Sequence, residues 1–204
     1  MRTLLFLFFL SLSLPAAARQ ENIQDMVIRA DLSSKRSEQK ELAEKGLQLA
    51  DQCIERNPKA VNCYYYRGQA RGLYYGNSPF GYAKRVRMMM TDWETSLKLD
   101  PTFNYGGPYR MFAELYINLP KYFGPKDLRQ DLNKAIQLLE KAIQISDYPS
   151  NTLDMAEAQL KAENKTEAEK AVQRAKKNLT KWQQDPYFQT WQETLSELDK
   201  KLAK

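Results

Sequence analysis

The sequence contains no histidine, only two cysteines and only eight glycines among its 204 residues. Without histidine the chain cannot form a Ser-His-Asp triad, and it has no imidazole to bind a metal or act as a base near neutral pH. Two cysteines alone do not complete a four-ligand zinc site. There is no glycine-rich phosphate loop next to a strand, and no segment alternates apolar and polar residues as a strand does. We therefore expect an all-α protein that is not an enzyme and holds no cofactor or metal.

The start of the chain has the three parts of a secretory signal peptide. A positively charged first segment is followed by an apolar run from Leu4 to Leu14 and by an Ala16-x-Ala18 cleavage site. The apolar run is too short to span a bilayer, and no cysteine lies near the cleavage site to carry a lipid anchor. We expect residues 1–18 to be removed, leaving 19–204 as a single helical repeat domain that is exported and soluble in the periplasm.

One spacing of residues recurs and predicts pairs of helices. Ala135, Leu139 and Ala142 lie four and three residues apart, which places them on one helical face. A small residue lets a second helix approach closely, and this unit, closed by a proline, is typical of the second helix of a tetratricopeptide repeat. The same spacing recurs at Gly46, Ala50 and Cys53, at Met89, Trp93 and Ser96, and at Ala168, Val172 and Ala175.

First helices that match these second helices are expected after Pro58, after Pro101 and after Asp147. The fold predicted from this pattern is an α-solenoid of tetratricopeptide-repeat-like antiparallel helix pairs, with about nine helices in all. Ordered loops are expected at 76–81 and 119–128, and a short helix or packed arm at 19–30. A C-terminal helix opening at Pro186 would cap the array, with an apolar stripe formed by Phe188, Trp191, Leu195 and Leu198.

The two cysteines lie five residues before and five residues after Pro58, on helices that are expected to be adjacent and antiparallel. Cys53 and Cys63 can form a disulfide there, and an exported protein can keep one. The alternative is that both are small core residues, because the helix phase decides whether their side chains meet.

The chain carries a formal net charge of +6, which by itself raises the question of an anionic partner. The positive residues are spread along the sequence, and the main clusters are Lys84-Arg85-x-Arg87 and Lys176-Lys177. With export expected as well, we predict an ordinary charged surface and no nucleic-acid partner.

A candidate ligand-binding face follows from the repeat register. The register places Tyr64 in the core and Tyr65 on the inner, concave face, where Gly106-Gly107-Pro108 is expected to present Arg110. Such a face would suit a zwitterionic, peptide or carboxylate ligand. The alternative is that its charges are plain i,i+4 helix pairs. The candidate residues are Tyr65, Gln69, Tyr74, Tyr75, Arg110, Glu114, Asn118, Glu157 and Lys161.

Several short motifs occur in a fixed order: Tyr74-Tyr75-Gly76, Leu99-Asp100-Pro101, Gly106-Gly-Pro-Tyr-Arg110, Glu114-Leu-Tyr-x-x-Leu-Pro120 and the helix from Ala135. In this order they resemble the T component of tripartite (TRAP-type) periplasmic transporters, a family of exported tetratricopeptide-repeat proteins. The resemblance implies a periplasmic solute-binding protein as partner and a small hydrophobic or carboxylate ligand. It also implies a homo-oligomer, a trimer around a ligand-conducting hole.

Two classes of function stay open at this point. The first is an accessory binding protein of a solute-uptake system, as the resemblance implies. The second is a general periplasmic repeat scaffold that holds another envelope protein, which any repeat array of this kind can be.

Overall fold

The computed structural model describes residues 22–76 and 81–203, and this part of the chain is helical, with no strand. The prediction of an all-α fold is confirmed for these residues. The predicted signal peptide, 1–18, and most of the predicted loop at 76–81 lie outside them. The helices are α1 (Ile23–Leu32), α2 (Arg36–Arg56), α3 (Val61–Tyr75), α4 (Tyr82–Leu99), α5 (Phe103–Asn118), η1 (Lys126–Leu128), α6 (Leu132–Ile145), α7 (Pro149–Lys161), α8 (Lys165–Leu179), η2 (Thr180–Trp182) and α9 (Phe188–Leu202).

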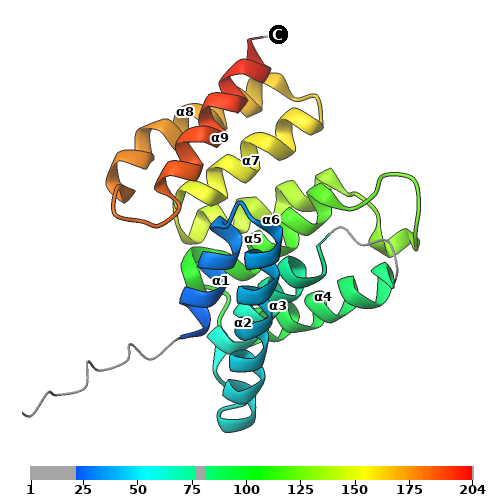
Figure 1. The fold of residues 1–204 in the computed structure, drawn as a ribbon. Helices are drawn as coiled ribbons and strands as arrows, with labels where there is room; N and C mark the ends of the chain where they lie inside the picture. Colours follow the sequence, from blue (N-terminus) through cyan, green and yellow to red (C-terminus); the bar gives the residue numbers. More distant parts are fainter. Residues whose placement is uncertain (1–21, 77–80, 204) are drawn as a thin grey trace, which may run out of the picture.

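Neighbouring helices pack against each other along the whole described chain. Each α-helix contacts the next one, and alternate helices also touch, α1 with α3, α3 with α5, α5 with α7 and α7 with α9. Figure 1 shows α2, α3 and α4 at one end, α5 and α6 in the middle, and α7, α8 and α9 at the other end. None of the described helices is long and apolar enough to cross a membrane.

The small residues singled out in the sequence are points of close helix contact. Ala135, Leu139 and Ala142 are fully buried on α6. A Cβ atom added to Gly68 of α3 would lie 2.3 Å from Nε1 of Trp93 on α4, so the indole ring occupies the space that glycine leaves. The periodicity therefore located the buried faces of these helices correctly.

The two cysteines are joined. Cys53 near the end of α2 and Cys63 near the start of α3 form a disulfide, with their Cα atoms 5.9 Å apart. Of the two alternatives that the sequence left open, the structure shows the first. The bond ties together the ends of two antiparallel helices across the turn at Pro58.

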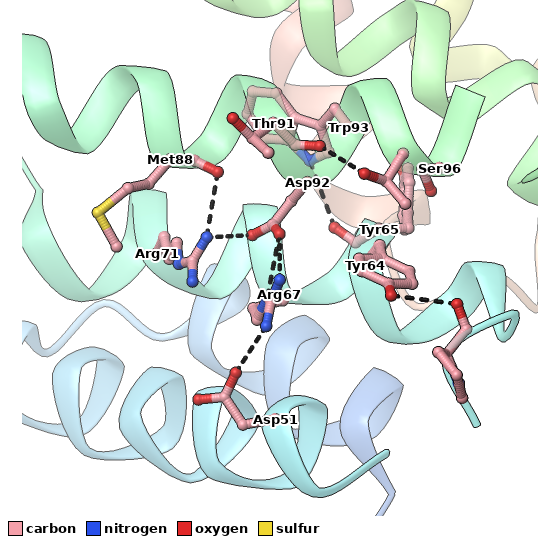
Figure 2. Close-up of polar contacts among 12 residues, drawn as sticks. Asp51, Tyr64, Tyr65, Arg67, Arg71, Met88, Thr91, Asp92, Trp93 and Ser96 are labelled. Carbon is pink, nitrogen blue, oxygen red and sulfur yellow. Dashed lines mark hydrogen bonds and ion pairs between the residues drawn. The ribbon is translucent and has the colours of Figure 1, made fainter. Parts of the chain in front are cut away.

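A buried ion network holds α3 against α4 (Figure 2). Asp92 of α4 is 1% exposed, and its two carboxylate oxygens accept from Arg67 at 2.6 Å and from Arg71 at 2.5 Å. Arg67 reaches back to Asp51 of α2 at 2.8 Å. The indole N–H of Trp93 donates to the carbonyl of Tyr65 at 3.3 Å. Three helices are thus joined, α3 to α4 through the buried Asp92 carboxylate and α2 to both through Arg67.

Removal of this carboxylate should be costly. Asp92→Ala removes the buried carboxylate that Arg67 and Arg71 share, and we expect it to lower the free energy of unfolding by about 3 kcal/mol. The measurement is denaturant unfolding at neutral pH. Asp51→Ala removes the exposed end of the same network and should cost less than about 1 kcal/mol. If both variants lost the same free energy of unfolding, the burial of Asp92 would not be what makes its ion pairs stabilising.

The C-terminal helix α9 packs on the rest of the molecule through the predicted stripe. Trp191, Leu195 and Leu198 are buried, and Phe188 packs against the core with part of its side chain exposed. The indole N–H of Trp191 donates to Oγ of Ser150 on α7 at 2.9 Å. The stripe is confirmed, and α9 covers the end of the helix array, packing against α7 and α8.

Removal of the Trp191 indole should therefore destabilise the packing of α9 on α7 and α8. Trp191 is 4% exposed, and Trp191→Ala should cost about 3–5 kcal/mol because it leaves a large cavity. Thermal and denaturant unfolding measure the loss. Gln192 is the exposed neighbour of Trp191, and Gln192→Ala serves as the control, which should change stability by less than about 0.5 kcal/mol. A loss below about 1 kcal/mol for Trp191→Ala would show that α9 does not depend on this contact.

Candidate functional site

A polar pocket lies where α1, α3, α5 and α7 meet. Its volume is about 210 Å³, and the turn before α9 closes one side of it. Most of the lining side chains are polar, and we call this site the polar pocket from here on. It is lined by Gln24, Ile28, Asp31, Tyr66, Gln69, Asn104, Tyr105, Arg110, Met111, Glu114, Tyr148, Ser150, Asp185, Pro186 and Tyr187.

Arg110 is the central residue of the pocket wall. Its side chain is only about 5% exposed. Its Nη1 donates to Oδ1 of Asn151 at 3.0 Å, and its Nη2 donates to the hydroxyl of Tyr65 at 2.9 Å. The guanidinium also lies over the ring of Tyr148, 5.3 Å from the ring centroid. Arg110 therefore links α3, α5 and α7. The expectation that Arg110 is presented on an open face is wrong, because its side chain is buried. The i,i+4 pair with Glu114 that was the alternative is present, with Nε and Oε1 3.6 Å apart.

The backbone before Arg110 takes an unusual path. Asn104, Tyr105 and Gly106 all have left-handed backbone angles, with φ of 48°, 62° and 79°. A Cβ atom on Gly106 would lie 3.0 Å from Cα of Ala142, and one on Gly107 would lie 2.7 Å from the Tyr65 hydroxyl. Two glycines are needed because α6 approaches on one side and Tyr65 on the other. The glycines do shape the backbone before Arg110, as expected, but the resulting turn buries Arg110 instead of presenting it on an open face.

The register predicted for α3 is wrong at Tyr64 and Tyr65. Tyr64 was expected in the core, but it is partly exposed, and its hydroxyl donates to the carbonyl of Pro58 at 3.1 Å. Tyr65 was expected on an open face, but it is fully buried against Phe103. The reason is that α3 is covered by α1, α2, α4 and α5, so the face that the register left open is filled by the start of α5.

Asn151 does not line the pocket itself, but it holds Arg110 in place, and the sequence did not single it out. It is fully buried. Its amide nitrogen donates to the carbonyls of Tyr105 and Ser146 at 2.9 and 3.0 Å while its oxygen accepts from Arg110. Its role depends on contacts with residues that are distant in the sequence, Tyr105 and Arg110, so no local signal marked it.

Acidic groups outnumber basic ones around the pocket. Asp31, Glu114 and Asp185 line it, against Arg110 alone. The Tyr187 hydroxyl donates to Asp31 at 2.9 Å, and the Tyr148 hydroxyl donates to Asp185 at 3.0 Å. Burial raises the pKa of both tyrosines, and the adjoining carboxylates raise it further. Both hydroxyls therefore stay protonated and serve as hydrogen-bond donors.

Glu114 and Asp154 form a carboxyl pair at the edge of the pocket. Oε1 of Glu114 lies 3.6 Å from Nε of Arg110, and solvent reaches 41% of its side chain. Desolvation by the surrounding protein nevertheless raises the pKa of Glu114 to about 7, although the positive charge of Arg110 lowers it. Burial also raises the pKa of Asp154, which hydrogen-bonds to Glu114. Two carboxyl groups this close retain a proton between them near neutral pH.

Stability should depend on pH through this pair. Because the folded-state pKa of Glu114, about 7, lies above its unfolded value of 4.5, the stabilisation is complete below pH 4.5 and is lost as pH rises through 7. The groups facing Glu114 are Arg110, Asp154, Asp31 and Glu157. Since solvent reaches this carboxyl, we expect a loss of roughly 1 kcal/mol, or about 2–4 °C in melting temperature, between pH 5 and pH 8.

Thermal melts of the wild type and of Glu114→Gln at several pH values test this expectation. The variant should lose most of the pH dependence, because glutamine does not titrate. Glu167→Gln removes an exposed carboxylate of α8 that pairs with Lys170, and it should keep the wild-type slope. A wild-type melting temperature that rises from pH 5 to pH 8 would contradict the raised pKa.

The remaining predicted residues lie in three places, of which two adjoin each other. Gln69 lines the polar pocket. Asn118, Glu157 and Lys161 form an exposed group that we call the α5–α7 rim, in which Lys161 contacts Glu157 at 2.8 Å and Asn118 at 3.3 Å. The Asn118 amide also donates to the carbonyl of Glu114 at 2.9 Å, so the rim lies one helical turn from the pocket.

Tyr74 and Tyr75 are not part of this site. They pack on each other at the end of α3, with ring centroids 5.2 Å apart. Tyr74 lies beneath Lys40, and Tyr75 lies beside Arg85 in a separate cavity between α3, α4 and the loop after α5. The single face predicted from the sequence therefore divides in the structure into the polar pocket, the α5–α7 rim and the cavity beside Tyr75, which Asn118 of the rim also lines.

Comparison with known proteins adds no assignment: no protein-family model matches the chain, and no curated protein matches it. The function is therefore argued from the polar pocket and its surroundings.

Proposed function

We propose that the chain is an exported, non-enzymatic tetratricopeptide-repeat binding protein that acts as an accessory (T) component of a TRAP-type solute-uptake system. In this role it engages a periplasmic solute-binding protein and receives a small solute. The observation that carries the proposal is the position of the polar pocket, which is lined by the alternate helices α1, α3, α5 and α7.

The order of helix contacts supports a repeat array. In a tetratricopeptide-repeat solenoid the first helices of successive repeats line the concave side, where ligands bind. Here α1, α3, α5 and α7 contact one another in sequence, and the small-residue spacing falls on α2, α4, α6 and α8. The polar pocket thus lies on the side that would be concave in such an array.

Two features support export. The disulfide between Cys53 and Cys63 fits an oxidising compartment such as the periplasm, because thiols are kept reduced in the cytosol. The first 18 residues also have the composition of a signal peptide.

The α5–α7 rim is the surface that we assign to the solute-binding protein. Its three side chains are polar and partly or fully exposed, as is usual for the edge of a transient interface. It adjoins Glu114 at the pocket, so a partner seated there would face the opening.

A general envelope scaffold is the second candidate function. The loop between α5 and α6 exposes two aromatic side chains, Tyr122 at 80% and Phe123 at 66%. Exposed aromatic residues side by side are common at protein contacts. This observation favours a protein partner but does not require a small ligand.

A crosslinking pull-down from the periplasm of the native cell distinguishes the two functions. Tagged protein should recover a solute-binding protein as its main partner. The double variant Asn118→Ala with Lys161→Ala should reduce that recovery about fivefold, since polar rim contacts contribute roughly 1 kcal/mol. Lys170→Ala removes a comparable exposed lysine, paired with Glu167 on α8, and should leave the recovery unchanged. An envelope-assembly complex recovered without any solute-binding protein would overturn the first function in favour of the second.

A further inference from the structure

We infer that the polar pocket binds a small organic cation, an amine of about the size of a basic amino-acid side chain or a short diamine. This inference rests on the proposed function and names its ligand. The class differs from the hydrophobic or carboxylate ligand that the family resemblance implies.

The first argument is the charge of the pocket wall. Three carboxyl-bearing residues, Asp31, Glu114 and Asp185, line it against one guanidinium. Behind Glu114, Oδ2 of Asp154 is buried without a hydrogen-bond partner. Even with one proton retained by the Glu114–Asp154 pair, the pocket keeps an excess of negative charge. An anionic ligand would be repelled, and a cation would be attracted.

The second argument is that Arg110 is already occupied. Its two terminal nitrogens donate to Asn151 and Tyr65, its Nε faces Glu114 at 3.6 Å, and one face lies on Tyr148. These contacts fix the guanidinium against α3 and α7, and a ligand carboxylate that pulled it into the pocket would leave Asn151 and Tyr65 with buried, unpaired groups, which is costly.

The third argument is that the carboxylates have acceptor sites to spare. Asp31 accepts from the Tyr187 hydroxyl, and Asp185 accepts from the Tyr148 hydroxyl and the Tyr187 backbone N–H. An ionised carboxylate offers about four acceptor positions, and an ammonium group brings three donors and no acceptor. These tyrosines also hold the two carboxylates in place, so the acceptors are ordered before a ligand arrives.

The shape and the aromatic walls favour an organic cation over a metal ion. Within 22–76 and 81–203, no three acidic or thiol side chains are grouped closely enough to bind a metal. The acceptors instead lie on α1, on α5 and in the turn before α9 around a cavity of about 210 Å³. Tyr66 and Tyr105 add ring surface to the same wall, and aromatic rings attract ammonium groups through their faces.

The test compares three ligands of the same length and different charge: 1,5-diaminopentane, 1,5-pentanediol and glutarate. Calorimetric titration at pH 7.5 and low salt should show binding of the diamine, with at least about tenfold weaker binding of the diol and the dicarboxylate. Asp31→Asn and Asp185→Asn should each weaken diamine binding about tenfold, since each removes one charge-assisted contact.

Glu167→Gln is the matched control, because it removes a carboxylate outside the pocket, and it should bind the diamine as the wild type does. Circular dichroism and melting temperature show that each variant is folded. The inference is overturned if the diol or glutarate binds as tightly as the diamine. It is also overturned if neither asparagine variant changes the affinity, or if no diamine binding is seen up to about 10 mM.

These outcomes are separable from those of the proposed function. Tight binding of glutarate would reject the cation while leaving a solute-binding role intact. If the crosslinking pull-down recovers no solute-binding protein, the proposed role in solute uptake is rejected, but the diamine titration is unaffected.

Discussion

The burial of one guanidinium group is the constraint on which the centre of this structure depends. Arg110 is only 4% exposed as a residue, and a buried charge is tolerated only when hydrogen bonds replace water. Those bonds come from Tyr65 on α3 and Asn151 on α7, so the charge can be satisfied only when α3, α5 and α7 are stacked in one arrangement. The left-handed turn at Asn104, Tyr105 and Gly106 then follows, because it brings the start of α5 close to α6 and Tyr65.

The pocket and the C-terminal end of the molecule are parts of the same packing unit. Tyr148 lies under Arg110 on one side and meets Trp182 and Trp191 edge-on, at 5.0 and 5.1 Å between ring centroids. The turn before α9 also contributes Asp185 and Tyr187 to the pocket. The docking of α9 therefore does more than cover the end of the array, because it places Asp185 and Tyr187 in the wall of the polar pocket and packs Trp191 against Tyr148.

The same groups that stabilise the fold set the chemistry of the pocket. Tyrosine hydroxyls orient Asp31 and Asp185, and Arg110 partly offsets the acidic excess from within the wall. These hydrogen bonds hold the pocket side chains in place, and such preorganisation would lower the entropic cost of the ligand binding that we propose. The Glu114–Asp154 pair adds a group that changes its charge near neutral pH, so the field inside the pocket becomes more negative as the pH rises.

The sequence alone determined the features that depend on local periodicity. These include the helical class, the small residues at Ala135 and Ala142 and the apolar stripe that contains Trp191. It left the cysteine pairing open and assigned the wrong environment to Tyr64, Tyr65 and Arg110. Only the tertiary structure decided these, because a residue's surroundings depend on which helices cover each face. Asp31 and Tyr187, 156 positions apart and hydrogen-bonded to each other, meet only once the intervening helices are stacked, and no spacing in the sequence encodes that distance.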